Sequence, residues 1–325
     1  MIRHGVCAIA LLTLAACGDG EGSTPGGGER DAAPSGTEQR LQALPTVRQE
    51  HAVVALAGEI YVIGGFAPGV TASVAAYDPA TNAWRAVADF PTAVHHANAA
   101  AVDDKLYVAG YYPGNSFLAP EPKLFEYDPR QNVWNERSAM PAGTQRAAAC
   151  VAALGGKIYL FGGARGGTVA EASAYDPAAD TWETLPPLPE TREHCVAGAI
   201  GGKLYIAGGR ADGITGFRPK TWAFDPASRS YTEKAAIPTP RGGCAGAVLD
   251  KLLFVFGGEG NAADPNGVFP KIEAYDSSAD RWTAFPDMLV PRHGFGAAEL
   301  GGRIYLPGGA NHQAFGAVDD HTVFE

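Results

Sequence analysis

Arginine and histidine supply most of the side chains in this sequence whose types and spacing could carry chemistry. The planar guanidinium fork pairs bidentately with carboxylates. Imidazole can transfer protons or bind a metal near neutral pH. Five arginines are spaced by about fifty residues or by about twice that distance, and histidines follow closely after them. The candidates are Arg48, Arg146, Arg192, Arg241, Arg292, His51, His95, His96, His194 and His293.

The cysteines offer less chemistry. Cys7 and Cys17 lie near the N-terminus, which leaves Cys150, Cys195 and Cys244, an odd number. We expect buried free thiols, and one Cys195–Cys244 disulfide is the alternative in an oxidising compartment. A nucleophilic Cys195 is disfavoured, because adjacent strand residues such as His194 point to opposite faces.

The elements that must position these residues repeat six times. Tyr61, Tyr107, Tyr159, Tyr205, Phe254 and Tyr305 share one column, with successive gaps of 46, 52, 46, 49 and 51 residues. Each follows by thirteen residues an arginine of the set above, or Val94 in the second repeat. Downstream, five segments of the type YDPATNAW place two aromatic residues seven positions apart. A β-patterned period of about fifty residues predicts propeller blades.

These marks resemble the kelch family: a double glycine after an apolar strand, then Tyr-Asp-Pro, then Trp. The resemblance covers residues 38–325 and implies an all-β, six-bladed propeller with four antiparallel strands in each blade. In one blade the predicted strands are 148–154, 157–162, 172–177 and 181–186. Gly155-Gly156 makes a hairpin that needs positive φ. Gly162-Gly163 ends a strand where neighbouring blades crowd together.

The last blade lacks an outer strand, because the chain stops at Phe324-Glu325. Residues 38–48, EQRLQALPTVR, match the register of residues 182–192. We therefore expect residues 38–45 to complete the last blade, which closes the ring and leaves no open sheet edge.

The resemblance also implies that the arginines and histidines face a bowl over the channel. In some kelch substrate adaptors, arginines of this column hold acidic peptides. The resemblance therefore implies a protein- or glycan-binding module whose partner is an acidic peptide or glycan. The alternative for the arginines is a structural role, bonding loop carbonyls. The net charge of −10 disfavours nucleic-acid binding, and we expect a monomer.

Enzymatic and metal-dependent functions are the weaker expectations. Three histidines at a channel mouth could hold zinc or copper, but no local motif supports a metal. We therefore predict neither metal nor cofactor. The runner-up function is a sugar-modifying enzyme resembling a sialate mutarotase, although no catalytic residues can be matched.

The N-terminus is typical of an exported protein. Residues 5–16 form an apolar run too short to span a membrane. The segment LAAC ending at Cys17 resembles a lipobox, which implies cleavage after residue 16 and lipid on Cys17; an ordinary cleaved signal is the alternative. Residues 17–37 read as a flexible tether. We expect a protein anchored in the cell envelope, in the outer membrane if the host is Gram-negative.

Overall fold

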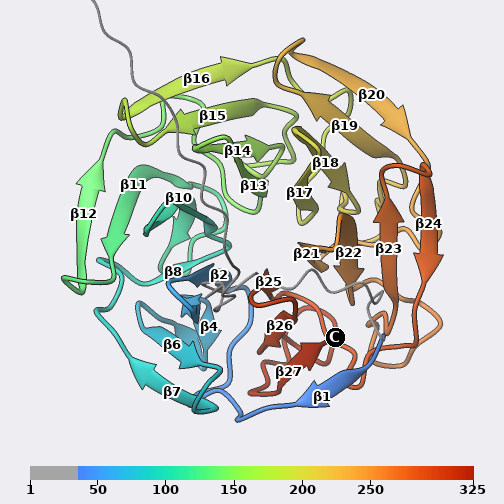
Figure 1. The fold of residues 1–325 in the computed structure, drawn as a ribbon, viewed down its shortest axis with the longest axis horizontal. Coiled ribbons are helices and arrows are strands. Elements are labelled where there is room, and N and C mark those ends of the chain that lie inside the picture. Colours follow the sequence, from blue (N-terminus) through green and yellow to red (C-terminus); the bar gives the residue numbers. More distant parts are fainter. Residues whose placement is uncertain (1–35) are drawn as a thin grey trace, which may run out of the picture. The chain divides into compact units, whose positions relative to one another are not determined.

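Six antiparallel sheets surround a central channel in this computed structural model, which describes residues 36–325 (Figure 1). None of these residues is helical. Blade 1 contains β2 (Ala52–Leu56), β3 (Glu59–Ile63), β6 (Val74–Asp78) and β7 (Ala83–Ala86), with a small hairpin of β4 (Phe66–Ala67) and β5 (Gly69–Val70). Blade 2 contains β9 (Asn98–Val102), β10 (Lys105–Pro113), β11 (Glu121–Asp128) and β12 (Val133–Arg137), and the short β8 (Val94–His95) also pairs with β10. The predicted kelch propeller is confirmed.

The next three blades repeat the same order from the channel outward. Blade 3 is β13 (Cys150–Leu154), β14 (Lys157–Phe161), β15 (Ala172–Asp176) and β16 (Thr181–Leu185). Blade 4 is β17 (Val196–Ile200), β18 (Lys203–Ala207), β19 (Thr221–Asp225) and β20 (Ser230–Lys234). Blade 5 is β21 (Ala245–Leu249), β22 (Leu252–Phe256), β23 (Ile272–Asp276) and β24 (Arg281–Ala284).

Blade 6 joins the two ends of the described chain. It contains β25 (Ala298–Glu299), β26 (Ile304–Pro307), β27 (His321–Phe324) and β1 (Glu38–Arg40). β1 pairs with β27 antiparallel, with Glu38 opposite Phe324 and Arg40 opposite Thr322, and the two strands lie side by side in Figure 1. The predicted closure is therefore confirmed, with regular pairing limited to residues 38–40.

The two glycine pairs of each repeat have different tasks. In blade 3, Gly155 and Gly156 form the β13–β14 turn with φ of 58° and 75°. A Cβ atom on Gly162 would lie 2.1 Å from the carbonyl oxygen of Arg192, and Gly163 donates a hydrogen bond to that oxygen. The second pair therefore allows one blade to touch the backbone of the next, as predicted.

Indole groups tie neighbouring blades together at the periphery. Trp182 donates its indole N–H to the carbonyl of Ser138 in the preceding blade, at 2.9 Å. Trp282 makes the equivalent bond to Ala235, also at 2.9 Å. The aromatic columns thus combine apolar packing with a satisfied polar atom, which is how buried tryptophan is usually accommodated.

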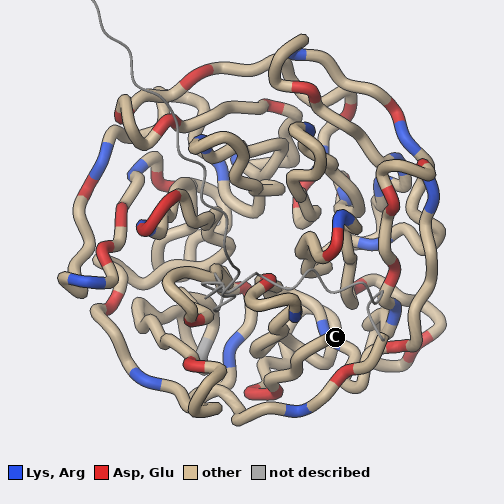
Figure 2. The backbone as a smooth tube through the Cα atoms, viewed as in Figure 1, with Lys and Arg blue, Asp and Glu red and all other residues tan. Residues whose placement is uncertain are grey.

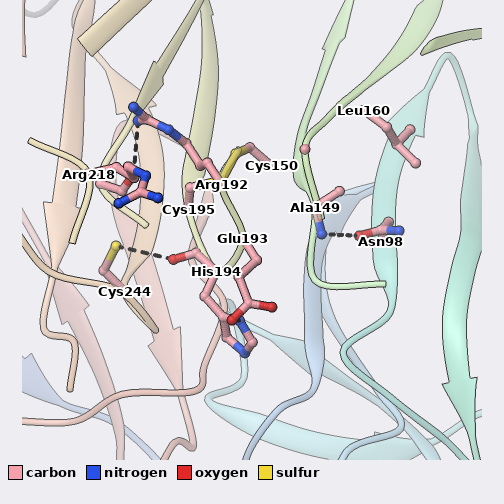
Figure 3. The surroundings of a disulfide bond; sticks show 12 residues. Asn98, Ala149, Cys150, Leu160, Arg192, Glu193, His194, Cys195, Arg218 and Cys244 are labelled. Carbon is pink, nitrogen blue, oxygen red and sulfur yellow. Dashed lines mark hydrogen bonds and ion pairs between the residues drawn. A yellow bond between two sulfur atoms is a disulfide. The ribbon is translucent and has the colours of Figure 1, made fainter. Parts of the chain in front are cut away.

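A disulfide joins Cys150 to Cys195, from the innermost segments of blades 3 and 4 (Figure 3). Cys244 is a buried free thiol. The expectation of a buried free thiol is therefore confirmed for Cys244 and wrong for Cys150 and Cys195, and the alternative Cys195–Cys244 pairing is wrong. Cys195 and Cys244 each follow their arginine by three residues and Cys150 by four. Because successive strand residues point in opposite directions, the one-residue offset turns Cys150 toward Cys195.

The predicted signal segment and the lipidation site at Cys17 lie outside the described residues. Among the described residues, no helix has the length and apolar character needed to cross a membrane.

Candidate functional site

The five arginines of the repeat lie inside the blades. Arg146, Arg192, Arg241 and Arg292 are fully buried, and Arg48 is nearly so. The Arg146 guanidinium donates to the carbonyls of Gly162, Leu160 and Thr144 in its own blade. Arg241 repeats this pattern with Gly257, Val255 and Thr239. The guanidinium groups bond main-chain carbonyls, which corrects the expectation that they face the bowl.

Burial also changes the electrostatics of these arginines. Loss of water lowers the pKa of Arg48, Arg146 and Arg292 to about 10, so they stay charged at neutral pH. Figure 2 shows Lys and Arg interspersed with Asp and Glu around the blades. The structure supports the alternative structural role of the arginine column.

Two of the predicted histidines are likewise structural. His51 is buried below the channel mouth and hydrogen-bonds the carbonyl of Pro307 at 2.9 Å. Burial lowers the pKa of His51 to about 3. His95 is fully buried; its Nε2 bonds the carbonyl of Ser116 and its ring packs against Phe117.

The remaining histidines meet at a ring of backbone around the channel. One residue per blade takes part, each two positions after the arginine column. Its N–H donates to the carbonyl of the equivalent residue one blade earlier, at 2.5–3.1 Å, and the last donation closes the circle. We call this the channel ring; its members are Glu50, His96, Ala148, His194, Gly243 and Gly294.

Every member of the channel ring has a left-handed backbone. The φ values of Glu50, His96 and His194 are 53°, 52° and 50°. Gly243 and Gly294 have 68° and 59°, and glycine adopts this region without steric cost. A non-glycine residue there is uncommon, and such strain tends to cluster at functional sites.

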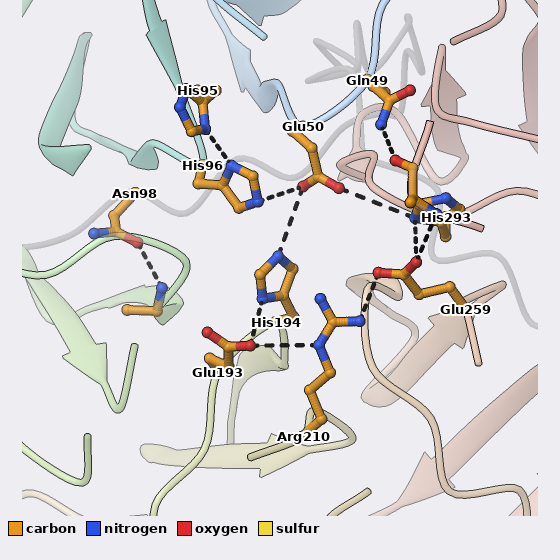
Figure 4. A network of polar contacts seen from close by, with 12 residues as sticks. Gln49, Glu50, His95, His96, Asn98, Glu193, His194, Arg210, Glu259 and His293 are labelled. Carbon is orange, nitrogen blue, oxygen red and sulfur yellow. Dashed lines mark hydrogen bonds and ion pairs between the residues drawn. The ribbon is translucent and has the colours of Figure 1, made fainter. Parts of the chain in front are cut away.

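The three polar side chains of the channel ring converge (Figure 4). His96 Nε2 lies 3.2 Å from Glu50 Oε2, and His194 Nε2 lies 3.8 Å from the same oxygen. Each of the three residues offers one ligand atom, and these atoms lie within 4.8 Å of one another. His293, which directly precedes ring member Gly294 in blade 6, is fully buried with Nδ1 4.0 Å from Glu50 Oε1.

Further acidic groups and one arginine surround this cluster. Arg210 contacts Glu259 at 2.5 Å and Glu193 at 3.4 Å. Burial raises the pKa of Glu193, but His194 and Arg210 outweigh it and hold that pKa at about 2. Burial, His194 and His95 together lower the pKa of His96 well below its usual value. An ionised Glu193 therefore lies near a neutral His96.

A pocket of about 410 Å³ opens above the channel ring. Its floor includes His96, His194 and Arg210, and its wall carries Tyr112 and Phe117. A second cavity of about 100 Å³ lies against the ring and reaches Cys195 and Phe295. The arrangement places proton-transfer and metal-binding groups at the base of an aromatic-walled pocket.

Sequence reasoning found His96, His194 and His293 but left Glu50, Glu193, Glu259 and Arg210 out of the predicted site. One signal was available for Glu50. It occupies the same repeat position as His96 and His194, two residues after the arginine column. Arg210 and Glu259 also share a repeat position, since each directly follows the double glycine that ends its strand.

Comparison with known proteins defines the class. The sequence matches the KLHDC2/KLHL20/DRC7 Kelch-repeats domain over residues 37–187 and 96–309. The chain therefore belongs to the kelch-repeat family, whose propellers typically serve in protein interactions.

Individual relatives are more distant. Kelch-like protein terF of Aspergillus terreus is 33% identical over 294 residues, which cover 83% of this chain and 62% of terF. Kelch-like protein 35 of Mus musculus is 33% identical over 158 residues, covering 48% of this chain and 26% of that protein. The chain thus spans less than two thirds of these relatives. The solved structure of YjhT has the same fold, with a TM-score of 0.72, 18% identity, and coverage of 88% of this chain and 99% of that one.

Proposed function

We propose that this propeller binds a protein partner through its bowl, by taking an apolar segment of that partner into the pocket above the channel ring. The observation that carries the proposal is an exposed apolar patch beside the pocket. Large exposed apolar groups on a soluble protein mark interaction sites when they are contiguous. A typical role of the family in protein interactions supports the same conclusion.

The patch spans three blades. Phe117 and Phe315 are 47% and 66% exposed, from the bowl loops of blades 2 and 6. Both contact Phe66 of blade 1, with ring centroids 5.9 and 5.7 Å apart. Leu118, 76% exposed, extends it. Aromatic rings bury a large area at little entropic cost, so they serve as anchors in interfaces.

The chemistry of the partner follows from the charges. An acidic peptide or glycan has less support than an apolar segment, because the five arginines bond carbonyls inside the blades. Arg210 is occupied by Glu193 and Glu259. A glycan that stacks on the same aromatic rings is the competing ligand.

Peptide and glycan arrays probed with the full chain test the proposal. We expect binding to peptides with aromatic or aliphatic residues, and Phe117→Ser with Phe315→Ser should abolish it. Val133→Ser is the matched control, because Val133 is also exposed but follows the β11–β12 turn on the opposite face. Binding to glycans alone, or binding unchanged in the double variant, would refute the proposal.

We also propose that the protein is tethered to the cell envelope through a lipid on Cys17. The support is the LAAC segment after a short apolar run. Several acyl chains anchor a protein firmly, whereas one holds it only marginally. Cys17→Ala should move the protein from the detergent phase to the aqueous phase after export. Equal partitioning of variant and wild type would contradict lipidation.

One observation favours a second candidate function, a sugar-modifying enzyme. The Glu50 carboxylate converges with the His96 and His194 imidazoles, and both imidazoles line the pocket. Such groups catalyse proton transfer. Anomer exchange of sialic acid, followed by NMR, tests this function. A rate equal to the uncatalysed rate would exclude that activity.

A further inference from the structure

We propose that Glu50, His96 and His194 bind a divalent first-row transition-metal ion, such as Zn²⁺, at the centre of the channel ring. Sequence reasoning predicted no metal, because the three ligands come from blades 1, 2 and 4 and form no local motif. The geometry that carries the proposal is the direction in which the lone pairs of the imidazole nitrogens point.

The hydrogen bonds of His95 and His96 fix where their protons lie. His95 Nε2 lies 2.8 Å from the carbonyl oxygen of Ser116, so it must donate. Neutral His95 then has a lone pair on Nδ1, which accepts from His96 Nδ1 at 2.5 Å. His96 therefore carries its proton on Nδ1, and its Nε2 lone pair faces the Glu50 carboxylate. Two acceptors 3.2 Å apart repel each other unless a cation or a proton lies between them.

The other two histidines also direct buried ring nitrogens at the cluster. His194 Nδ1 lies 3.4 Å from Glu193 Oε1 and its Nε2 lies 3.8 Å from Glu50 Oε2, and both buried nitrogens lack a hydrogen-bond partner. His293 donates from Nε2 to the carbonyl of His312 at 2.7 Å, so its Nδ1 carries a lone pair. That buried Nδ1 has no hydrogen-bond partner. Histidine ligands are usually oriented in this way by a carboxylate or carbonyl on the far nitrogen.

The spacing of the ligand atoms fits a metal. Zn²⁺ binds histidine nitrogen and carboxylate oxygen at about 2.0–2.2 Å, which puts two ligands of a tetrahedral site about 3.4 Å apart. The distances from Glu50 Oε2 to His96 Nε2 and His194 Nε2 are 3.2 and 3.8 Å. Two histidines and one carboxylate are a common ligand set for a metal ion that keeps an open coordination position. His96 and His194 also line the pocket above, so that position faces incoming ligands.

The charge of the cluster favours a cation. Three acidic side chains, Glu50, Glu193 and Glu259, surround one basic side chain, Arg210, so carboxylates outnumber guanidinium groups here by two. Their side chains are at most 17% exposed. Uncompensated charge is costly away from water, and one divalent ion balances this surplus.

The channel ring supplies a clean test. Because its members are left-handed, replacing a ligand by glycine preserves the backbone and relieves strain. His96→Gly and His194→Gly should therefore fold. Ala148→Gly is the matched control, because it introduces glycine at an equivalent position of the channel ring that carries no ligand.

The experiment is calorimetric titration of the metal-stripped, untagged full chain with Zn²⁺, and absorption spectroscopy with Co²⁺. We expect one ion per chain for the wild type and for Ala148→Gly. His96→Gly and His194→Gly should lose more than about 100-fold in affinity, since removing even an outer partner costs about 10- to 100-fold. Glu193→Gln, which removes the carboxylate that positions His194, should fall within that smaller range.

Melting curves of each metal-free variant verify that the propeller is folded. The proposal is overturned if the wild type takes up neither Zn²⁺ nor Co²⁺ stoichiometrically. That result would mean that a proton, shared between His96 and Glu50, separates the two acceptors. It is also overturned if folded His96→Gly and His194→Gly bind either ion as tightly as Ala148→Gly does.

Discussion

The Cys150–Cys195 disulfide ties blades 3 and 4 together beside the channel, where no strand pairing connects them. Replacing both cysteines by alanine removes the link and leaves the arrangement of the strands unchanged. Cys244→Ala is the matched control, because Cys244 is buried in the next blade but is not cross-linked. Figure 3 shows its sulfur directed at the carbonyl of His194.

The expected magnitude follows from the length of the closed loop. The two cysteines are 45 residues apart. In the chain-entropy account, closing a loop of that length in the unfolded chain is worth about 4 kcal/mol. At about 2 °C for each kcal/mol in a protein of this size, the midpoint of thermal unfolding should fall by about 8 °C. The Cys244→Ala control should cost about 1 kcal/mol, the amount typical of a small loss of core packing.

The assay combines melting curves with peptide mapping. Without reductant, tryptic peptides 147–157 and 193–203 should appear joined by one disulfide. Reductant should lower the midpoint of the wild type and leave that of the double variant unchanged. A map that joins Cys195 to Cys244, or three free thiols in protein isolated from an oxidising compartment, would refute the reasoning.

Three further predictions concern stability. Arg241→Met leaves buried Glu273 and four carbonyls without their partner, so urea unfolding should show a loss of about 3–5 kcal/mol. The exposed Arg229→Met should lose less than about 0.5 kcal/mol. Deleting residues 18–36 should leave the thermal midpoint unchanged, whereas deleting residues 18–45 removes β1 and should lower it sharply; equal midpoints would contradict closure by this strand. Burial lowers the pKa of His321 to about 3, so it takes up a proton only on unfolding. Its contribution to stability is complete above about pH 6.5 and is lost as pH falls toward 3. His321→Gln should flatten that dependence in melting curves recorded from pH 7.5 to 4.5, and an unchanged slope would count against it.

The fold was predictable from the sequence because each blade repeats the same physical requirements. Gly155-Gly156 turns a hairpin, Gly162-Gly163 admits the neighbouring backbone, and Trp182 reaches the preceding blade. Each requirement selects a residue type at a fixed position within the repeat, and the recurrence of that position in six aligned repeats makes the pattern visible. Even closure by residues 38–40 was readable, since the last blade visibly lacked a strand.

The site was predicted less well, because the sequence identified the residue types but not the directions in which their side chains point. The arginine column was identified, but spacing along the chain does not say whether a guanidinium turns outward to the bowl or inward to the carbonyls. The disulfide failed in the same way. A one-residue offset of Cys150 within its repeat decided the pairing, and the alignment of repeats hides such an offset unless each side chain is assigned a face.

The repeat separates structural residues from functional ones. A residue that every blade needs for folding recurs, as arginine does in five of six repeats and glycine does at the ends of the inner strands. At the ring position only the left-handed backbone is shared, and Ala148, Gly243 and Gly294 satisfy it without polar side chains. Folding therefore gives no reason for the polar side chains of Glu50, His96 and His194 at the other three positions. Three equivalent positions carry no polar side chain. We therefore expect the chemistry of the bowl at the positions where a blade differs from the other repeats.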